Sequence, residues 1–397
     1  MPPTHRQRAV QAFNAYILPA GWALFLTGMF WAWDRTLYHK LFYLFVAAPT
    51  LIALVLQPKH CKTLVCNPLF AAFALFSAYM MLTLNWTEGG DDFGSLIKRP
   101  LYVAMLLGAA GLIALNRPET LMRCTWIAGL VAALAAGVSV LYFYAVDFSP
   151  LIPRLTGYGA LYNPLLTAHV LGAFASFWLA TWFLSHKWWA PVPLVCLAIL
   201  GVALLATGSR TPLVGLSAVM LWLMLVGDKK RAVAIIAALT LAALAIALIA
   251  PEVFTQRGVS YRPSIWMNAL EQISARPWLG YGYDYPMVIA LPERAGPALA
   301  DPHNIELGVL YAGGIVGLTL WMLLYGLAAY FCWKNRHEPS VVICASWLIF
   351  GFFSGLTEGN AFMPRPKEHW FLIWIPLSLI YAQWLGKWQG WALKRPA

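Results

Sequence analysis

The stretch DPHNIELGVLYAGGIVGLTLWMLLYGLAAYFC (residues 301–332) joins a polar turn to an apolar run long enough to cross a membrane. A transmembrane helix needs about 20 predominantly apolar residues, and runs of this length recur along the chain. Of the 397 residues, 61% are hydrophobic and only 11% are charged, which excludes a soluble domain. Because the runs are continuous and not alternating, they predict helices and not barrel strands. We therefore expect an all-α membrane protein.

The apolar runs predict a polytopic bundle of about 12 transmembrane helices, forming a single integral membrane domain over residues 1–397. The bundle carries one long outer loop, residues 251–303, within which spacing of apolar residues over 263–275 predicts an amphipathic helix on the membrane surface or across the bundle mouth. The predicted spans are roughly 16–33, 41–57, 68–84, 100–116, 124–146, 163–185, 188–206, 212–227, 232–250, 304–332, 339–357 and 369–386.

The distribution of charge predicts the orientation. One set of predicted loops, which includes both termini, carries fifteen of the 27 Lys and Arg residues but only three of the 16 acids. The positive-inside rule places this set in the cytoplasm, so the loop 251–303 is expected in the periplasm of an inner-membrane protein. The net charge of +11 is spread over short loops, which indicates contacts with membrane lipids and no nucleic-acid partner.

Three basic residues on the outer face, Arg210, Arg262 and His303, each stand within two residues of a proline. Proline is favoured in the first turn of a helix, so each base is expected at or beside a helix N-terminus. Such termini bind anions, and an arginine there adds a bidentate donor suited to phosphate. Because the helix dipole disfavours a cation at this position, the pattern predicts a phosphorylated ligand.

Each of the three bases also has a structural interpretation. Arg210 fits an arginine that reaches the lipid headgroups, and Arg262 fits a surface salt bridge to Glu252 or Glu271. A buried structural histidine is the alternative for His303. The coincidence of all three at helix starts favours a functional site.

Further charged and polar residues on the same face are candidates for supporting roles. Glu306, one helical turn beyond His303, is expected to orient the imidazole or raise its pKa. The helix start and the two arginines are expected to outweigh it and to lower the pKa of His303. Arg365 and Lys367 are candidates for binding a second phosphate or a lipid headgroup. The other polar residues on this face are Asp301, Asn304, Glu358 and Glu368.

The sequence contains no acidic cluster of the kind that holds Mg²⁺. Among its six cysteines, Cys61 and Cys66 have no matching His or Cys pair. We therefore expect no disulfide, no metal and no cofactor.

At these residues the chain resembles the O-antigen ligase and polymerase superfamily. The resemblance covers roughly residues 200–330, and the first half matches only as hydrophobic spans. The matching pieces are Gly208-Ser209-Arg210-Thr211, then Arg262 with Ile265-Trp266, Ala269-Leu270, Ile273, Pro277 and Gly280-x-Gly282, and finally His303-Asn304 with Leu307.

The resemblance implies an inner-membrane, metal-independent glycosyltransferase whose donor is a glycan linked to undecaprenyl pyrophosphate. Arginines at helix starts, Arg210 and Arg262, suit a pyrophosphate leaving group. A histidine, His303, suits removal of a proton from an acceptor hydroxyl near neutral pH. Direct attack by that hydroxyl would invert the anomeric centre.

The members of this superfamily differ in their acceptor. Ligases transfer to lipid A–core, polymerases to another lipid-linked glycan, and O-oligosaccharyltransferases to a Ser or Thr of a protein. The short chain and compact loop favour an O-antigen ligase of lipopolysaccharide. A secondary transporter, the alternative from another class, would place charges within spans and repeat one half of the chain in the other, and the sequence has neither pattern.

Overall fold

A computed structural model describes residues 10, 12–90, 92–147, 154–185, 187, 189–227, 230, 231, 233, 237, 261–291, 297–359 and 361–392 of the chain. Almost all of the ninth predicted span, 232–250, lies outside these residues. So do residues 251–260 and 292–296 of the predicted outer loop.

Helices form nearly all of the regular structure, and the described residues add only an isolated antiparallel bridge between Ile289 and Leu299. The first half of the chain forms η1 (Phe13–Ile17), α2 (Leu18–Gly28), α3 (Arg35–Phe42), η2 (Tyr43–Ala47), α4 (Ala48–Leu56), α5 (Pro58–Val65), α6 (Pro68–Leu82), η3 (Thr83–Asn85), α7 (Phe93–Asn116), α8 (Pro118–Tyr142), η4 (Phe143–Asp147), η5 (Gly159–Leu161) and α9 (Pro164–Phe183). The second half forms α10 (Pro191–Thr207), α11 (Thr211–Val226), α14 (Arg262–Ala275), α15 (Ile305–Lys334), α16 (Pro339–Gly355), η6 (Glu368–Phe371) and α17 (Trp374–Ala392).

The prediction of an all-α protein is confirmed within the described residues, and each predicted span other than the ninth coincides with a helical region. The count of about 12 membrane crossings stays a prediction. Six helical stretches are long and apolar enough to cross a membrane, judged by length and composition: Arg35–Leu56, Pro68–Asn85, Phe93–Asn116, Glu119–Val146, Pro164–Phe183 and Ile305–Lys334.

Two of these stretches begin earlier than predicted because an aspartate caps each of them. Asp34 accepts a hydrogen bond from the backbone of Leu37 at 2.6 Å, so α3 begins six residues ahead of the predicted span. Asp92 caps α7 through the backbone of Ser95. Capping side chains satisfy N–H groups that lack a helical partner, which lets a polar first turn form ahead of the apolar run.

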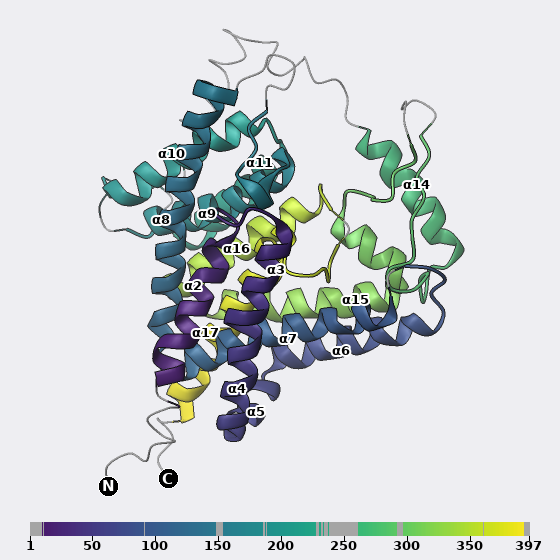
Figure 1. Ribbon diagram of the computed structural model, residues 1–397, viewed down its shortest axis with the longest axis horizontal. Coiled ribbons are helices and arrows are strands. Elements are labelled where there is room, and N and C mark those ends of the chain that lie inside the picture. The colour runs from purple at the N-terminus through teal and green to yellow at the C-terminus, as the bar shows by residue number, and fades with distance from the viewer. Residues whose placement is uncertain are drawn as a thin grey trace.

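The helices pack as a bundle in which segments far apart in sequence lie together. Helix α17 packs along α7, α15 along α6, and α16 against both α9 and α11 (Figure 1). The start of α2 and the end of α17 lie at the same end of the molecule (Figure 1). That both termini lie on the cytoplasmic side of the membrane stays a prediction.

The predicted amphipathic helix forms as α14, one residue longer than expected. Its buried residues Ile265, Ala269 and Ile273 pack with Tyr311 of α15. The apolar stripe is therefore covered by the N-terminal part of α15, and the position of α14 relative to the membrane stays a prediction.

Helix α15 is interrupted at Gly314, where the backbone has φ 61° and ψ −164°. A side chain there would meet the carbonyl oxygen of Trp278 at 2.2 Å, so the turn after α14 approaches α15 closely. The backbone N–H groups of Tyr281 and Gly282 donate to carbonyls of α15 that precede the break. The Gly280-x-Gly282 sequence thus forms a structural turn on α15.

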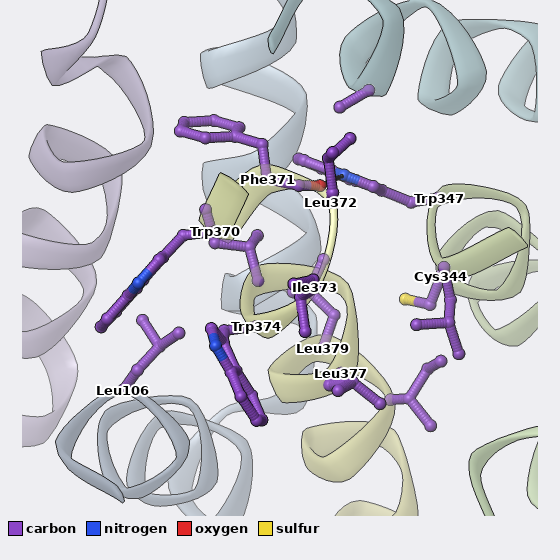
Figure 2. Packing of buried hydrophobic residues seen from close by; sticks show 14 of the residues in the cluster. Leu106, Cys344, Trp347, Trp370, Phe371, Leu372, Ile373, Trp374, Leu377 and Leu379 are labelled. Carbon is purple, nitrogen blue, oxygen red and sulfur yellow. Dashed lines mark hydrogen bonds between the residues drawn. The ribbon is translucent and has the colours of Figure 1, made fainter. Parts of the chain in front are cut away.

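The connection between α16 and α17, residues 356–359 and 361–373, is mostly irregular and yet lies in the core. Trp370, Phe371 and Trp374 are buried at its centre (Figure 2). Three indole N–H groups donate to carbonyl oxygens of the connection: Trp347 to Phe371 at 2.6 Å, Trp370 to Pro364 at 3.0 Å and Trp374 to Phe362 at 2.8 Å. These bonds satisfy carbonyls that no regular helix would satisfy in an apolar bundle.

Gly351 lets this connection pass against α16. A Cβ atom at this position would lie 1.8 Å from the carbonyl oxygen of Leu372. Even one added methyl group would therefore displace backbone and not merely a flexible side chain.

We predict that Gly351→Ala destabilises the protein by about 3 kcal/mol, a typical upper cost for forced overpacking. Gly326→Ala is the matched control, because a Cβ at Gly326 meets nothing within 4 Å. Alanine is also favoured over glycine in a helix by about 1 kcal/mol, so the control should be neutral or stabilising. Thermal unfolding of the detergent-solubilised variants measures both effects, and equal unfolding temperatures for the two would contradict the close approach.

Candidate active site

The turn before α15 holds His303 in an unusual backbone conformation. His303 has φ 49°, in the left-handed region that costs an ordinary residue about 1–2 kcal/mol. The Asp301 Oδ1 atom accepts a hydrogen bond from the His303 backbone N–H at 2.7 Å, which stabilises the turn locally. Strain of this kind is often retained where a side chain must be aimed.

Asn304 fixes this turn to the end of α16. Its Oδ1 atom caps α15 by accepting from the backbone of Leu307 at 2.9 Å. Its Nδ2 atom donates to the carbonyl of Leu356 at 2.9 Å. The residues that follow Leu356 are thereby held beside His303.

Glu358 contacts two of the candidate residues, His303 and Arg262. Its Oε1 atom lies 3.0 Å from Nδ1 of His303, and its Oε2 atom accepts from Nη2 of Arg262 at 3.1 Å. Glu358 is only 7% exposed, so its negative charge depends on these two partners for compensation. One carboxylate therefore joins the turn before α15, the start of α14 and the end of α16.

These contacts change the protonation of both groups. The hydrogen bond that His303 donates to the Glu358 carboxylate raises the pKa of His303 above its ordinary value, against the opposing effect of burial. Burial acts to raise the pKa of Glu358, but the bond to His303 and the charges of His169, His303 and Arg262 together lower it. The prediction that the pKa of His303 is lowered was wrong, because a carboxylate outweighs the helix dipole and the arginine.

The contact with Glu358 also determines the tautomer of neutral His303. Nδ1 must carry the proton to donate to the carboxylate, so Nε2 has the free lone pair. A carboxylate behind the imidazole stabilises the cation that forms when Nε2 accepts a proton. The pair is thus suited to general-base chemistry.

The two arginines occupy the predicted helix starts but differ in surroundings. Arg262 is the first residue of α14, and its carboxylate partner is Glu358, not Glu271; Glu252 lies outside the described residues. Arg210 precedes α11 and is exposed, and no hydrogen bond or ion pair of its side chain is present in the described part of the chain. Gly215, one turn into α11, packs on Ser354 near the end of α16. The start of α11, which Arg210 precedes, is therefore next to the end of α16, which Glu358 follows.

Glu306 does not support His303 as expected. Its carboxylate faces Trp321 and Tyr325 in the bundle, and the carboxylate on His303 is Glu358. A spacing of one helical turn brings two side chains together only if both residues are helical. His303 has a left-handed backbone outside α15, so its side chain and that of Glu306 point apart. Asp301 stays close, with Oδ1 at 3.9 Å from Nδ1 of His303, and burial raises its pKa.

Arg365 and Lys367 belong to the same connection as Glu358, between α16 and α17. They form part of the wall of a cavity of about 600 Å³, which Pro302 also lines. Arg365 donates to Ser95 Oγ at 2.8 Å. Both residues are therefore near the turn that carries His303, but neither contacts its side chain.

The prediction from sequence placed Glu358 on the same face as His303 but gave it no role, and it did not single out His169. His169 is fully buried in α9, interacts electrostatically with Glu358 and packs against His369 with ring centroids 5.9 Å apart. An ionisable residue inside an apolar span was the available signal. Among the described residues no group of three or more His, Cys, Asp and Glu forms a potential metal site, and metal independence stays a prediction.

Comparisons with known proteins agree on a single family. A family model described as O-antigen ligase matches residues 194–322, a stretch that includes Arg210, Arg262 and His303. An O-antigen ligase of Pseudomonas aeruginosa is 56% identical over 380 residues, covering 96% of this chain and 94% of that protein. The similarity therefore extends through Glu358 and over nearly the whole sequence.

We predict that His303 titrates above the ordinary histidine pKa of about 6.5 and that Glu358→Gln lowers its pKa. Diethylpyrocarbonate reacts with neutral imidazole, so peptide mass spectrometry of the modified protein across pH reports the titration. Since the pKa is raised in the folded protein, the pair contributes its full stability below the unfolded-state pKa and loses it as pH rises through the folded pKa. Glu306→Gln is the control, and a similar shift in both variants would contradict the assignment of Glu358.

Proposed function

The chain belongs to the O-antigen ligase family, and on this premise we propose that it is a lipopolysaccharide O-antigen ligase. It transfers a glycan from undecaprenyl pyrophosphate to a sugar hydroxyl of lipid A–core, at the periplasmic face of the inner membrane. The observation that carries the proposal is the contact of Glu358 with both His303 and Arg262. It brings a base and an anion-binding group to one position.

The donor is held by Arg210 and Arg262. The pyrophosphate develops charge as the bond to the sugar breaks, and guanidinium groups fixed at helix starts stabilise that charge without a metal ion. Arg262 is 27% exposed and is held by a buried carboxylate, so it is preorganised while still accessible. Arg210 is exposed, which leaves its guanidinium accessible to the same pyrophosphate.

The acceptor is activated by His303. The acceptor hydroxyl oxygen bonds to the anomeric carbon while the bond between that carbon and the pyrophosphate oxygen breaks. The hydroxyl proton passes to Nε2 of His303, and the bond electrons leave with the pyrophosphate. Because a single displacement occurs from the face opposite the leaving group, the anomeric configuration inverts.

Glu358 acts as a positioning residue for His303. It fixes the tautomer with the lone pair on Nε2 and stabilises the imidazolium that forms. It also binds Arg262, so the base and one phosphate ligand share a support. Glu358 itself takes no proton from the substrate.

Ligase activity is favoured over the other transfers of the superfamily by the similarity to a named O-antigen ligase along nearly the full length of both chains. Polymerase and protein O-oligosaccharyltransferase activities are the alternatives. The family also argues against a secondary transporter. The periplasmic side follows from the charge asymmetry of the loops, with both termini cytoplasmic.

The test is transfer by the purified full-length protein in nanodiscs, with undecaprenyl-pyrophosphate-linked glycan as donor. We expect glycan to appear on lipid A–core, with an inverted linkage and with the same rate in excess EDTA. Transfer to a second lipid-linked glycan would indicate a polymerase, and transfer to protein Ser or Thr an oligosaccharyltransferase. Activity that disappears with EDTA and returns with Mg²⁺ would refute metal independence.

Substitutions separate the proposed roles. His303→Ala should lower transfer by about a hundred- to ten-thousand-fold while donor affinity stays, because the arginines still bind the pyrophosphate. Arg210→Ala and Arg262→Ala should lower turnover by roughly a hundred- to a thousand-fold, and lysine should not restore it because the planar fork is lost. Arg276→Ala is the control, since Arg276 directly follows the far end of α14 and stacks on Tyr281.

The measurements are turnover and equilibrium donor binding of each variant. Loss of donor binding in His303→Ala would make His303 a phosphate ligand or a structural residue. Normal turnover of both arginine variants would overturn the pyrophosphate assignment.

A further inference from the structure

A cavity of about 600 Å³ lies next to the candidate active site but has no part in the reaction as described so far. It is enclosed by the starts of α3, α7 and α15, by residues 283–287 and by the connection between α16 and α17. Pro302, the residue before His303, lines it. The cavity therefore reaches the short turn that carries His303.

Positive charge dominates the wall of this cavity. Its ionisable lining comprises one carboxylate, Asp284, together with His39 and the cations Arg35, Arg99, Arg365 and Lys367. Asp284 pairs with Arg99 at 3.0 Å, and the buried Glu368 behind the wall pairs with Arg35. Within the described part of the chain, neither Arg365 nor Lys367 forms a salt bridge.

Lys367 is the most informative of these cations, because it is half-buried. Burial lowers its pKa, and the negative charges of Glu368 and Asp301 oppose this effect. A half-buried ammonium group without an ion pair is costly, and an anionic ligand would offset that cost. Arg365, exposed at the rim, adds a second donor suited to phosphate oxygens.

The remaining wall favours a sugar ring beside the anion. Tyr283, Tyr285 and Tyr311 line the cavity together with Met287 and Phe362. A volume of several hundred Å³ with aromatic walls and a few converging polar groups is typical of a site for a small organic ligand. A bare inorganic anion would leave most of this space unfilled.

The donor pyrophosphate is already accounted for on other elements. Arg210 and Arg262 belong to the starts of α11 and α14, and neither residue lines the cavity. The acceptor, by contrast, must place a hydroxyl at His303, one residue from the cavity wall. Arg365 and Lys367 line the cavity that reaches this turn, so they are available to bind the acceptor.

We propose that this cavity binds the phosphate group of a phosphorylated acceptor saccharide, with Lys367 and Arg365 as its ligands. The inference rests on the proposed function, because it assigns the ligand to the acceptor of that reaction. It adds a requirement that ligase activity alone does not imply, namely that acceptor recognition depends on a phosphate remote from the hydroxyl that reacts.

The experiment measures equilibrium binding of lipid A–core to the full-length protein in nanodiscs without donor. The acceptor is used intact, after enzymatic dephosphorylation and after chemical reduction of its sugar carboxylates. The variants are Lys367→Gln and Arg365→Gln. Lys98→Gln is the control, because Lys98 is exposed beside Arg99 and does not line the cavity.

Dephosphorylation should weaken binding to the wild-type protein about tenfold or more, as expected for loss of a charged hydrogen bond. Lys367→Gln and Arg365→Gln should weaken binding of the intact acceptor and leave binding of the dephosphorylated acceptor unchanged. Lys98→Gln should bind like the wild type. Arg365→Gln decides the matter if Lys367→Gln does not fold, because Arg365 is exposed.

If Lys367→Gln and Arg365→Gln weakened binding of the intact and the dephosphorylated acceptor equally, the inference would be overturned. Loss of the variant effect only after carboxylate reduction would also overturn it, because it would identify a carboxylate as the ligand. A separate titration of the same variants with donor alone should match the wild type, and weakened donor binding would identify the pyrophosphate as the ligand and overturn the inference. Because acceptor binding is measured without donor, absence of transfer in the wild type would contradict the proposed function and not this site.

Discussion

The site depends on one constraint: a stretch of chain that is mostly not helix lies largely buried in a helical bundle, where its backbone has no regular helical partners. Residues 356–359 and 361–373 meet this constraint through indole donors from Trp347, Trp370 and Trp374, which bind carbonyls of the connection. The absence of a side chain at Gly351 lets the connection approach α16. Irregular backbone is tolerated in a membrane protein where it is buried in protein and its polar groups are satisfied. Once anchored, the connection carries Glu358 at one end and Lys367 near the other.

A second constraint follows from the burial of charge. Glu358 is largely withdrawn from solvent, so its carboxylate requires partners on both oxygens, and Arg262 and His303 supply them from α14 and from the turn before α15. Removing either partner would leave a buried charge partly unpaired, which typically costs several kcal/mol. The same contacts raise the pKa of His303 and fix its tautomer. Structural stability and the proposed chemistry therefore use the same three side chains.

Much of this architecture could be predicted from the sequence because its causes are local. Apolar runs and caps such as Asn304 define where helices lie, and α14 follows from the spacing of Ile265, Ala269 and Ile273. The helix starts at Arg262 and beside Arg210 follow from neighbouring prolines. Glu306 was a candidate for the supporting carboxylate because it is one turn from His303 in sequence. The structure instead places Glu358 on His303, and the left-handed turn at His303 separates the side chains of His303 and Glu306.

The sequence by itself determined the fold class, the approximate positions of the long apolar helices and the helix starts at Arg262 and beside Arg210, because helix formation and capping depend on neighbours within a few residues. Only the tertiary structure decided which charges meet. Glu358 is 96 residues from Arg262 and 55 from His303 along the chain. It reaches them because an irregular connection, whose path follows no periodic pattern, is held in the core by long-range hydrogen bonds and close packing. Such contacts depend on how helices pack, and no local spacing records them.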